Sequence, residues 1–180
     1  MDTGSGGWET PVNLGCALNS AQFDDGPSFF QDPTSGAVTM YFTSQNRPGG
    51  PGDFDIWASI QQSDGTWGVA ANVAELNSAY RDTRTAIRND GLEIYLTSNR
   101  PGSEVDSTNA PSLDIWVSTR ASTSDPWGPP SDVAGDINSA YSDGAPAISS
   151  DGTEMYFYSN RPDGSGLNDL YVVTRTKIVH

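Results

Sequence analysis

A sequence unit of about 60 residues occurs three times in this chain, and this repetition limits the folds open to it more than any other feature. Each copy opens on Asn-Ser-Ala, at Asn19, Asn77 and Asn138, and then carries an Asn-Arg-Pro turn and a segment of the type Asp-Ile-Trp. A unit repeated at such a period needs its neighbours to bury its apolar faces. We therefore expect residues 1–180 to form one domain built as an array of similar units.

Each unit reads as a set of short strands. Runs rich in aromatic and branched residues, such as Met40–Thr43, Ile94–Thr97 and Met155–Tyr158, are separated by turn residues, and no stretch keeps helical spacing for three turns. Asp-Gly at positions 90–91 and 151–152 supplies the left-handed backbone of a tight hairpin. Four such strands per unit match a β-propeller blade, so the predicted fold class is an all-β propeller of four-stranded antiparallel blades, three per chain.

The units are offset by one strand. Residues 8–20 open on Trp8, which matches Trp67 and Trp127, and they resemble the fourth strand of a unit whose first three strands are missing. The expected blades are residues 21–77, 78–138 and 139–176, the last with three strands.

Three blades are too few to close a ring, since propellers have four to eight. We therefore expect a homodimer, a six-bladed ring in which residues 8–20 of each chain complete the last blade of its partner. The alternative is a fragment of a larger propeller, which would leave strand edges exposed.

Composition excludes several classes of function. The formal net charge is −14, with 9 basic and 23 acidic residues, which argues against nucleic acid and anionic membrane surfaces as partners. A single cysteine, Cys16, is expected to be a small buried hydrophobe, and a single histidine, His180, ends the chain. This content argues against common zinc sites and against Ser-His-Asp or Cys-His catalysis. No apolar run reaches the length of a membrane span, so no membrane insertion is expected.

Residues 143–162, Asp-Gly-Ala-Pro-Ala-Ile-Ser-Ser-Asp-Gly-Thr-Glu-Met-Tyr-Phe-Tyr-Ser-Asn-Arg-Pro, together with Asp-Leu-Tyr-Val at 169–172, resemble the TolB-type, or WD40-like, propeller repeat. The resemblance covers residues 8–175 and implies the fold. Members of this family are often periplasmic or exported and often bind proteins or the cell envelope, so a periplasmic or secreted location is what the resemblance implies. Residues 1–7 carry no secretory signal, although a leader removed earlier would leave none.

Arginine and aspartate recur as a pair in every unit. A feature required once per unit is expected to be structural, an internal clamp in which the planar guanidinium grips a carboxylate. The expected pairs are Arg47 with Asp55, Arg100 with Asp114, and Arg161 with Asp169.

Arg84 and Arg88 occur only in the second unit, on the strand expected to line the central channel. Strand periodicity predicts that they share one face, which would place a cationic spot in an acidic protein and suit a carboxylate or phosphate ligand. The alternative is pairing with local acids such as Asp82 or Asp90. The predicted channel ligand residues are Arg84, Arg88, Asp82, Asp24 and Asp143.

The predicted function is a non-enzymatic binding or scaffold module that recognises a protein or a small ligand at the channel mouth, an anion being one option. A glycosidase-like hydrolase using channel carboxylates is the alternative, and Ser63–Trp67 resembles the structural Asp-box hairpin of sialidases without its spacer residue. No cofactor is expected. The acidic, Gly-rich loops 51–55, 104–109 and 163–169 leave open either Ca²⁺ binding through oxygens or solvated turns.

Overall fold

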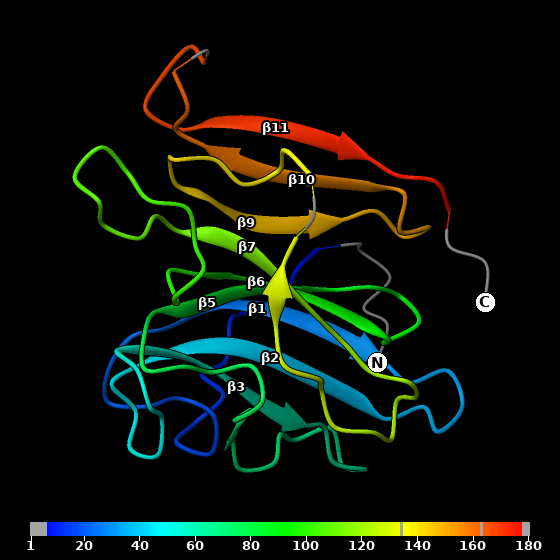
Figure 1. The fold of residues 1–180 in the computed structure, drawn as a ribbon. Coiled ribbons are helices and arrows are strands. Elements are labelled where there is room, and N and C mark those ends of the chain that lie inside the picture. The colour runs from blue at the N-terminus through cyan, green and yellow to red at the C-terminus, as the bar shows by residue number, and fades with distance from the viewer. Residues whose placement is uncertain (1–6, 134, 163, 178–180) are drawn as a thin grey trace.

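The computed structural model describes residues 7–133, 135–162 and 164–177, which form strands and no helix (Figure 1). None of these residues lies in a helix that could cross a membrane. Residues 1–6, which bear on the secretory signal, and His180 lie outside the described residues. The strands are β1 (Asp24–Gln31), β2 (Val38–Gln45), β3 (Phe54–Ile60), β4 (Ala71–Asn72), β5 (Asp82–Ile87), β6 (Glu93–Ser98), β7 (Asp114–Thr119), β8 (Ser131–Asp132), β9 (Asp143–Ile148), β10 (Glu154–Ser159) and β11 (Asp169–Thr174).

The strands form three antiparallel sheets in chain order. The first sheet is β1-β2-β3-β4, the second is β5-β6-β7-β8, and the third is β9-β10-β11. The hairpins between the first two strands of the second and third sheets turn on Gly91 and Gly152, whose φ angles of 71° and 73° favour glycine. Each sheet is thus an up-and-down meander, as the short aromatic runs and Asp-Gly turns predict.

The register of the second and third strands is the same in every sheet. Tyr41, Tyr95 and Tyr156 lie opposite Ala58, Val117 and Val172. Because successive side chains of a strand point to opposite faces, the strands of the second sheet present one apolar face to the first sheet and one to the third, whereas the first and third sheets each face one neighbouring sheet. The near-continuous apolar runs in the sequence follow from this two-sided burial.

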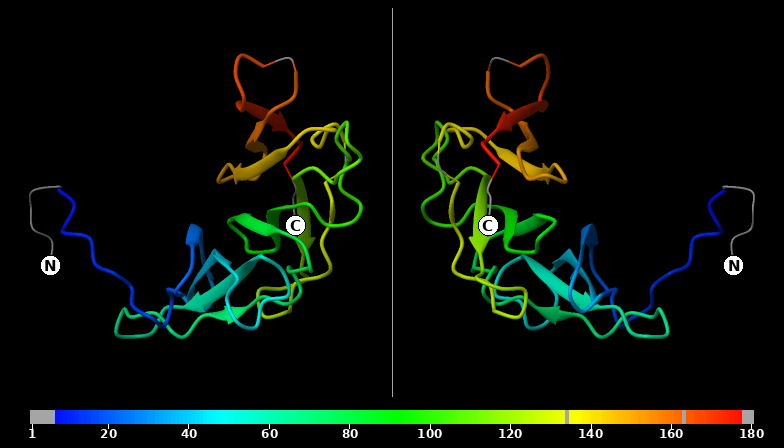
Figure 2. Two further views of the ribbon diagram at one scale, coloured as in Figure 1. Left: turned by 90° about the vertical axis from the view of Figure 1, so that its left-hand side faces the viewer. Right: turned by 90° about the vertical axis from the view of Figure 1, so that its right-hand side faces the viewer.

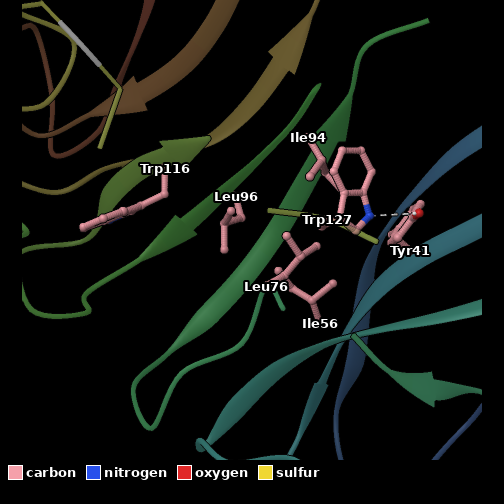
Figure 3. Packing of buried hydrophobic residues seen from close by; sticks show 7 residues of the cluster. All are labelled: Tyr41, Ile56, Leu76, Ile94, Leu96, Trp116 and Trp127. Carbon is pink, nitrogen blue, oxygen red and sulfur yellow. Dashed lines mark hydrogen bonds between the residues drawn. The ribbon is translucent and has the colours of Figure 1, made fainter. Parts of the chain in front are cut away.

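The core between the first and second sheets includes an indole from the second sheet (Figure 3). Trp127, on the segment leading into β8, donates its Nε1–H to the Tyr41 hydroxyl at 3.3 Å, and the two rings meet edge to face at 6.3 Å. Leu76, from the connection between β4 and β5, is fully buried in the same core. We call this contact between neighbouring sheets a joint. The cluster comprises Tyr41, Ile56, Leu76, Ile94, Leu96, Trp116 and Trp127.

The three sheets follow one another along an open arc, and the segment that starts the chain projects away from them (Figure 2). Residues 7–15 form no strand, because they have no neighbouring strand to pair with. Cys16 is exposed, so the expectation of a buried cysteine is wrong in the described chain; it lies at the end of this projecting segment. The outer face of the third sheet is also uncovered, with Leu170 85% exposed.

Candidate functional site

The inner strands β1, β5 and β9 each carry an irregularity in their pairing with the second strand of the sheet. At this position Gly26, Arg84 and Ala145 have φ angles of 62°, 48° and 50°. Left-handed backbone is uncommon for residues other than glycine, and a bulge redirects the side chain that it carries. The backbone of Arg84 is held in this conformation by Thr43 of the first sheet, whose hydroxyl oxygen accepts the Arg84 N–H at 3.0 Å. At this position of the bulge the second sheet carries an arginine, whereas the first sheet has a glycine and the third an alanine.

Arg84 lies in a cavity of about 390 Å³ where the inner strands meet. Its side chain is 53% exposed, and its Nη2 lies 3.8 Å from Oδ2 of Asp25. An exposed pair at this distance contributes little energy, so a ligand anion can compete with Asp25 for the guanidinium. The lining residues are Asp25, Gly26, Pro27, Arg84, Thr85, Ala145 and Pro146.

Arg88 does not share this site, so the prediction that it shares a face with Arg84 is wrong. The bulge between Thr83 and Ala86 breaks the alternation on which that prediction rested. The Arg88 side chain is buried and ion-paired with Asp90 at 2.6 Å and Glu93 at 2.8 Å. The local pairing considered as the alternative is what the structure has, although its second acid is Glu93 rather than Asp82.

The aspartates predicted to line the channel are instead structural. Asp82 and Asp143 are fully buried. Oδ2 of Asp143 accepts the backbone N–H and the hydroxyl of Ser139 at 2.8 and 2.7 Å. Asp82 accepts the same two bonds from Ser78, and Asp24 accepts them from Ser20. Each aspartate thus holds the Asn-Ser-Ala segment to its own sheet, and it is therefore not a channel ligand residue.

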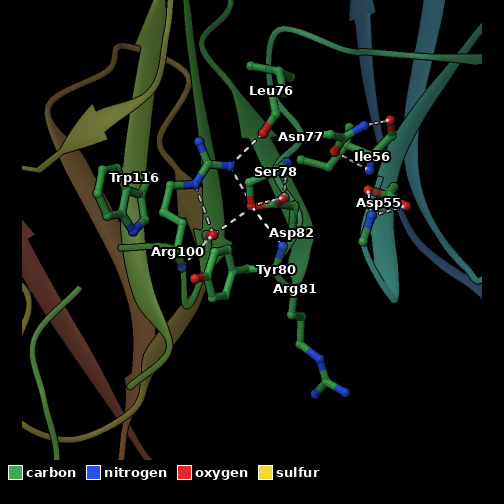
Figure 4. Close-up of polar contacts among 12 residues, drawn as sticks. Asp55, Ile56, Leu76, Asn77, Ser78, Tyr80, Arg81, Asp82, Arg100 and Trp116 are labelled. Atoms are coloured by element: carbon green, nitrogen blue, oxygen red, sulfur yellow. Dashed lines mark hydrogen bonds and ion pairs between the residues drawn. The ribbon is translucent and has the colours of Figure 1, made fainter. Parts of the chain in front are cut away.

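The repeated arginines lie against these same aspartates, so the predicted pairings are wrong; Figure 4 shows the second copy, Arg100 with Asp82. Arg100 donates to Oδ1 of Asp82 at 2.5 Å and to the Leu76 carbonyl at 2.6 Å. Arg161 makes the equivalent bonds to Asp143 and Ile137 at 2.7 Å. Arg47 bonds the Leu18 carbonyl but lies 4.0 Å from Asp24. In each copy the arginine therefore clamps the incoming connection to its own sheet.

The remaining aspartates of the predicted clamp accept hydrogen bonds from the loop between the second and third strands. Asp55 accepts the Gly52 N–H at 3.1 Å, Asp114 the Glu104 N–H at 2.6 Å, and Asp169 the Gly166 N–H at 3.0 Å. Burial raises the pKa of Asp55 to about 6 and that of Asp114 to about 6. Neither carboxyl is accessible to a ligand, because both side chains are fully buried.

The acidic loops use their carboxylates for their own backbone. Asp106 accepts the N–H groups of Thr108 and Ala110 at 2.7 and 3.1 Å, an arrangement typical of Asx turns. The described residues contain no group of three or more His, Cys, Asp or Glu side chains placed to hold a metal ion. Part of the third loop, residue 163, lies outside the described residues.

A second cavity, of about 650 Å³, lies between the second and third sheets. Sequence reasoning did not identify it, although it named the missing fourth strand of the last unit. One feature of the sequence does point to this cavity: an arginine directly follows the third strand in two units, at Arg120 and Arg175. Arg175 lines this cavity.

The comparisons with known proteins identify the fold. No family model and no curated protein matches the chain. Among solved structures, the chain is similar to the Hadza microbial sialidase Hz136, with a TM-score of 0.56 and 12% identity over 83% of this chain and 34% of the sialidase. It also matches a thermostable family-43 glycoside hydrolase at a TM-score of 0.49 and 14% identity, over 91% of this chain and 62% of the hydrolase. The chain thus has a propeller-like arrangement of antiparallel sheets and spans about a third of the length of the sialidase.

Proposed function

We propose that this chain is a non-enzymatic binding module, in which three propeller blades present a ligand-binding mouth where β1, β5 and β9 meet. The proposal rests on Arg84, a half-exposed arginine held in left-handed backbone and directed into a cavity of about 390 Å³. Ligand pockets are furnished with a few placed polar groups. Asp25, Arg84 and Thr85 supply such groups here, and the remaining lining residues, Gly26, Pro27, Ala145 and Pro146, are small or cyclic.

The ligand that fits is a small molecule or protein segment bearing a carboxylate. The guanidinium of arginine binds a carboxylate through two parallel hydrogen bonds. Asp25, at 3.8 Å from Arg84, would then be free to accept a hydroxyl or amine of the same ligand. A sugar acid has both kinds of group.

The hydrolase alternative is supported by the fold that the chain shares with about a third of a sialidase, whereas the Arg84 cavity offers little of the chemistry that it needs. Glycoside hydrolysis requires two carboxyl groups that reach one substrate. Asp25 is the one carboxylate that lines the Arg84 cavity within the described part of the chain, while Asp24, Asp82 and Asp143 hold backbone segments. The resemblance to a sialidase, at 12% identity, bears on the fold and suggests a sugar acid as the probe.

Arg84→Gly tests the proposal, because glycine is the natural residue at the equivalent position 26 and suits the backbone there. We expect sialic acid to raise the Tm of the unsubstituted protein by a few degrees at saturating concentration, and glucose at matched ionic strength to have no effect. Arg84→Gly should abolish the shift. Arg81→Ala is the control, since Arg81 is also exposed and pairs with Asp53 at 3.5 Å away from the cavity.

A shift that survives Arg84→Gly, or that Arg81→Ala removes equally, would show general charge binding and exclude the site. Absence of a shift with sialic acid, acetate and phosphate alike would exclude an anion ligand.

A further inference from the structure

The cavity between the second and third sheets is an unfilled copy of a joint that the chain fills elsewhere. Tyr95 lines it at the position that Tyr41 holds in the first joint. In the first joint, the Trp127 indole occupies the space beside Tyr41 and is 6% exposed. No tryptophan lines the second joint within the described residues. The apolar residues facing this space include Tyr95, Val117, Met155, Phe157, Ile148 and Val173.

An arginine is in place over both joints. Arg120 donates Nε–H to the Gly91 carbonyl at 2.6 Å, and its guanidinium carbon lies 4.2 Å from the Trp127 ring centre. Arg175 donates Nε–H to the Gly152 carbonyl at 2.7 Å, in the same way. Arg175 is thus already held where it would stack on an indole, a favourable cation–π contact.

Trp8 is the tryptophan without a site. It is fully exposed, at 103% of the reference area, which is unfavourable for the largest apolar side chain. It precedes Asn19 by the same 11 residues that separate Trp127 from Asn138. Asn19 donates its amide N–H to Oδ1 of Asn13 at 3.2 Å, and Asn138 bonds Asp132 in the same way. Residues 13–19 therefore already share part of the local conformation that residues 132–138 adopt after β8.

The Asn-Ser-Ala segment joins two sheets in its second and third copies and only one in its first. Asn77 bonds the N–H and C=O of Ile56 at 2.7 and 2.8 Å, and Asn138 bonds both groups of Ile115 at 2.8 Å. Within the described residues, the Asn19 side chain bonds Asn13 and makes no such bonds to a strand. The equivalent backbone groups are those of Leu170, on the unpaired edge of β11. Unpaired edges are sites for strand addition.

The two end faces of the arc match as the faces of the first joint do. Tyr156 on the third sheet corresponds to Tyr41, and Trp67 on the first sheet corresponds to Trp127. Leu170 and Val172, 85% and 54% exposed, would meet the Leu18 region as Ile56 meets Leu76. The two uncovered surfaces are therefore the two halves of one joint.

From these observations we propose that the occupant of the cavity is Trp8 of a second copy of this chain. Each copy places Trp8 under Arg175 of the other, sets Val12 opposite Val172 on β11, and binds Leu170 through Asn19. A two-fold axis makes both exchanges equivalent, closes the arc into a ring of six sheets and covers both edges. This inference is independent of the ligand proposed for Arg84.

Light scattering on the purified chain is the first test. We expect twice the chain mass of 19.1 kDa at micromolar concentration. Trp8→Ala should raise the dissociation constant of the dimer on the order of a hundredfold or more, because a buried tryptophan is lost from two equivalent interface sites. Val105→Ala, on an exposed loop of the second sheet, is the matched control and should leave the mass unchanged. A monomer at 100 µM, or a dimer indifferent to Trp8→Ala, would overturn the proposal.

Cross-linking between two single-cysteine variants is the second test and does not depend on how Trp8→Ala folds. In the first two sheets the matching positions Ala71 and Ser131 pair with Ala58 and Val117. Val12→Cys and Val172→Cys are therefore made in separate chains, each with the exposed Cys16 changed to Ser. After mixing and mild oxidation we expect a disulfide between the two different chains. Leu167→Cys in place of Val172→Cys is the control and should not react. No preference for the Val12–Val172 pair would exclude this register.

Discussion

The first and second joints of this molecule have the same geometry and different contents. In the first, an indole, a tyrosine and aliphatic side chains from two sheets form a closed core around Trp127. In the second, Tyr95, Met155 and Phe157 take the equivalent places around a cavity of about 650 Å³. The difference lies in one segment, the fourth strand with its leading tryptophan. In this fold, the core between two sheets is therefore completed by a tryptophan that precedes the fourth strand of the second of them, as Trp127 precedes β8.

Burial is highest in the second sheet and lower in the first and third sheets, which each have one neighbouring sheet. The second sheet has a sheet on each side, and β6 is buried throughout. The third sheet has a neighbour on one side, so β11 alternates between half-buried and exposed residues. Because apolar burial is the main favourable contribution to folding, the second sheet is expected to be the most stable part of the single chain.

The largest effect is expected when the indole is removed from the first joint, which would then resemble the second. Trp127→Ala should make it resemble the second and lower the free energy of unfolding by about 4 kcal/mol, since a cavity replaces a buried indole. Urea denaturation at fixed protein concentration measures this. Trp127→Phe should recover part of the loss, because it restores ring packing without the hydrogen bond to Tyr41. A loss below about 1 kcal/mol would mean that the indole does not determine the joint.

A smaller effect is expected from the clamps that bring the connections into the two joints. Arg100→Ala should lower the free energy of unfolding by about 3 kcal/mol, because it leaves the Asp82 carboxylate buried without its cation. Arg161→Ala should cost about 1 to 2 kcal/mol, since its side chain is 22% exposed against 10% for Arg100 and water can replace it. Urea denaturation measures both losses. Equal losses of unfolding free energy would show that the connections into the first and second joints are held equally well.

A third effect is a dependence on pH, which is confined to acidic solution. The pKa of Asp114 is raised to about 6 by burial, above the usual 3.8, so between about pH 4 and 6 the unfolded chain releases a proton that the folded chain retains. Stability should therefore fall as pH rises through this window, by up to about 3 kcal/mol for this group. Asp114→Asn should flatten the profile of Tm against pH. Asp55→Asn should do the same at the first joint, where the pKa is also about 6. An unchanged slope in both variants would contradict burial as the cause.

Much of the fold could be predicted because it depends on local pattern. Aromatic and branched runs with Asp-Gly turns predict strands and hairpins, and the repetition predicts three similar sheets. The fourth-strand character of residues 8–20 stays a prediction: it rests on the Trp8 to Asn19 spacing, which equals that of Trp127 to Asn138, and residues 7–15 form no strand in the single chain.

The candidate site could be predicted only in part. Arg84 was identified because it breaks the repeat, and the structure places it in a cavity between the inner strands. Arg88 was misplaced because the bulge before it shifts the alternation, and no residue in the sequence marks a bulge unambiguously.

What the sequence alone determined is which positions are equivalent: each arginine of the Asn-Arg-Pro turns is followed by an aspartate within the first two residues of the next strand. Only the tertiary structure decided the partners. Ser98 lies in register with Asp82 on one side and Asp114 on the other, so spacing gives the nearby arginine two candidate acids. Asp114 is engaged by the Glu104 N–H and the Ser112 hydroxyl, whereas Asp82 faces the connection whose Leu76 carbonyl Arg100 also binds. The choice follows from where backbone donors lie in space, and it takes the packed sheets to bring those donors together.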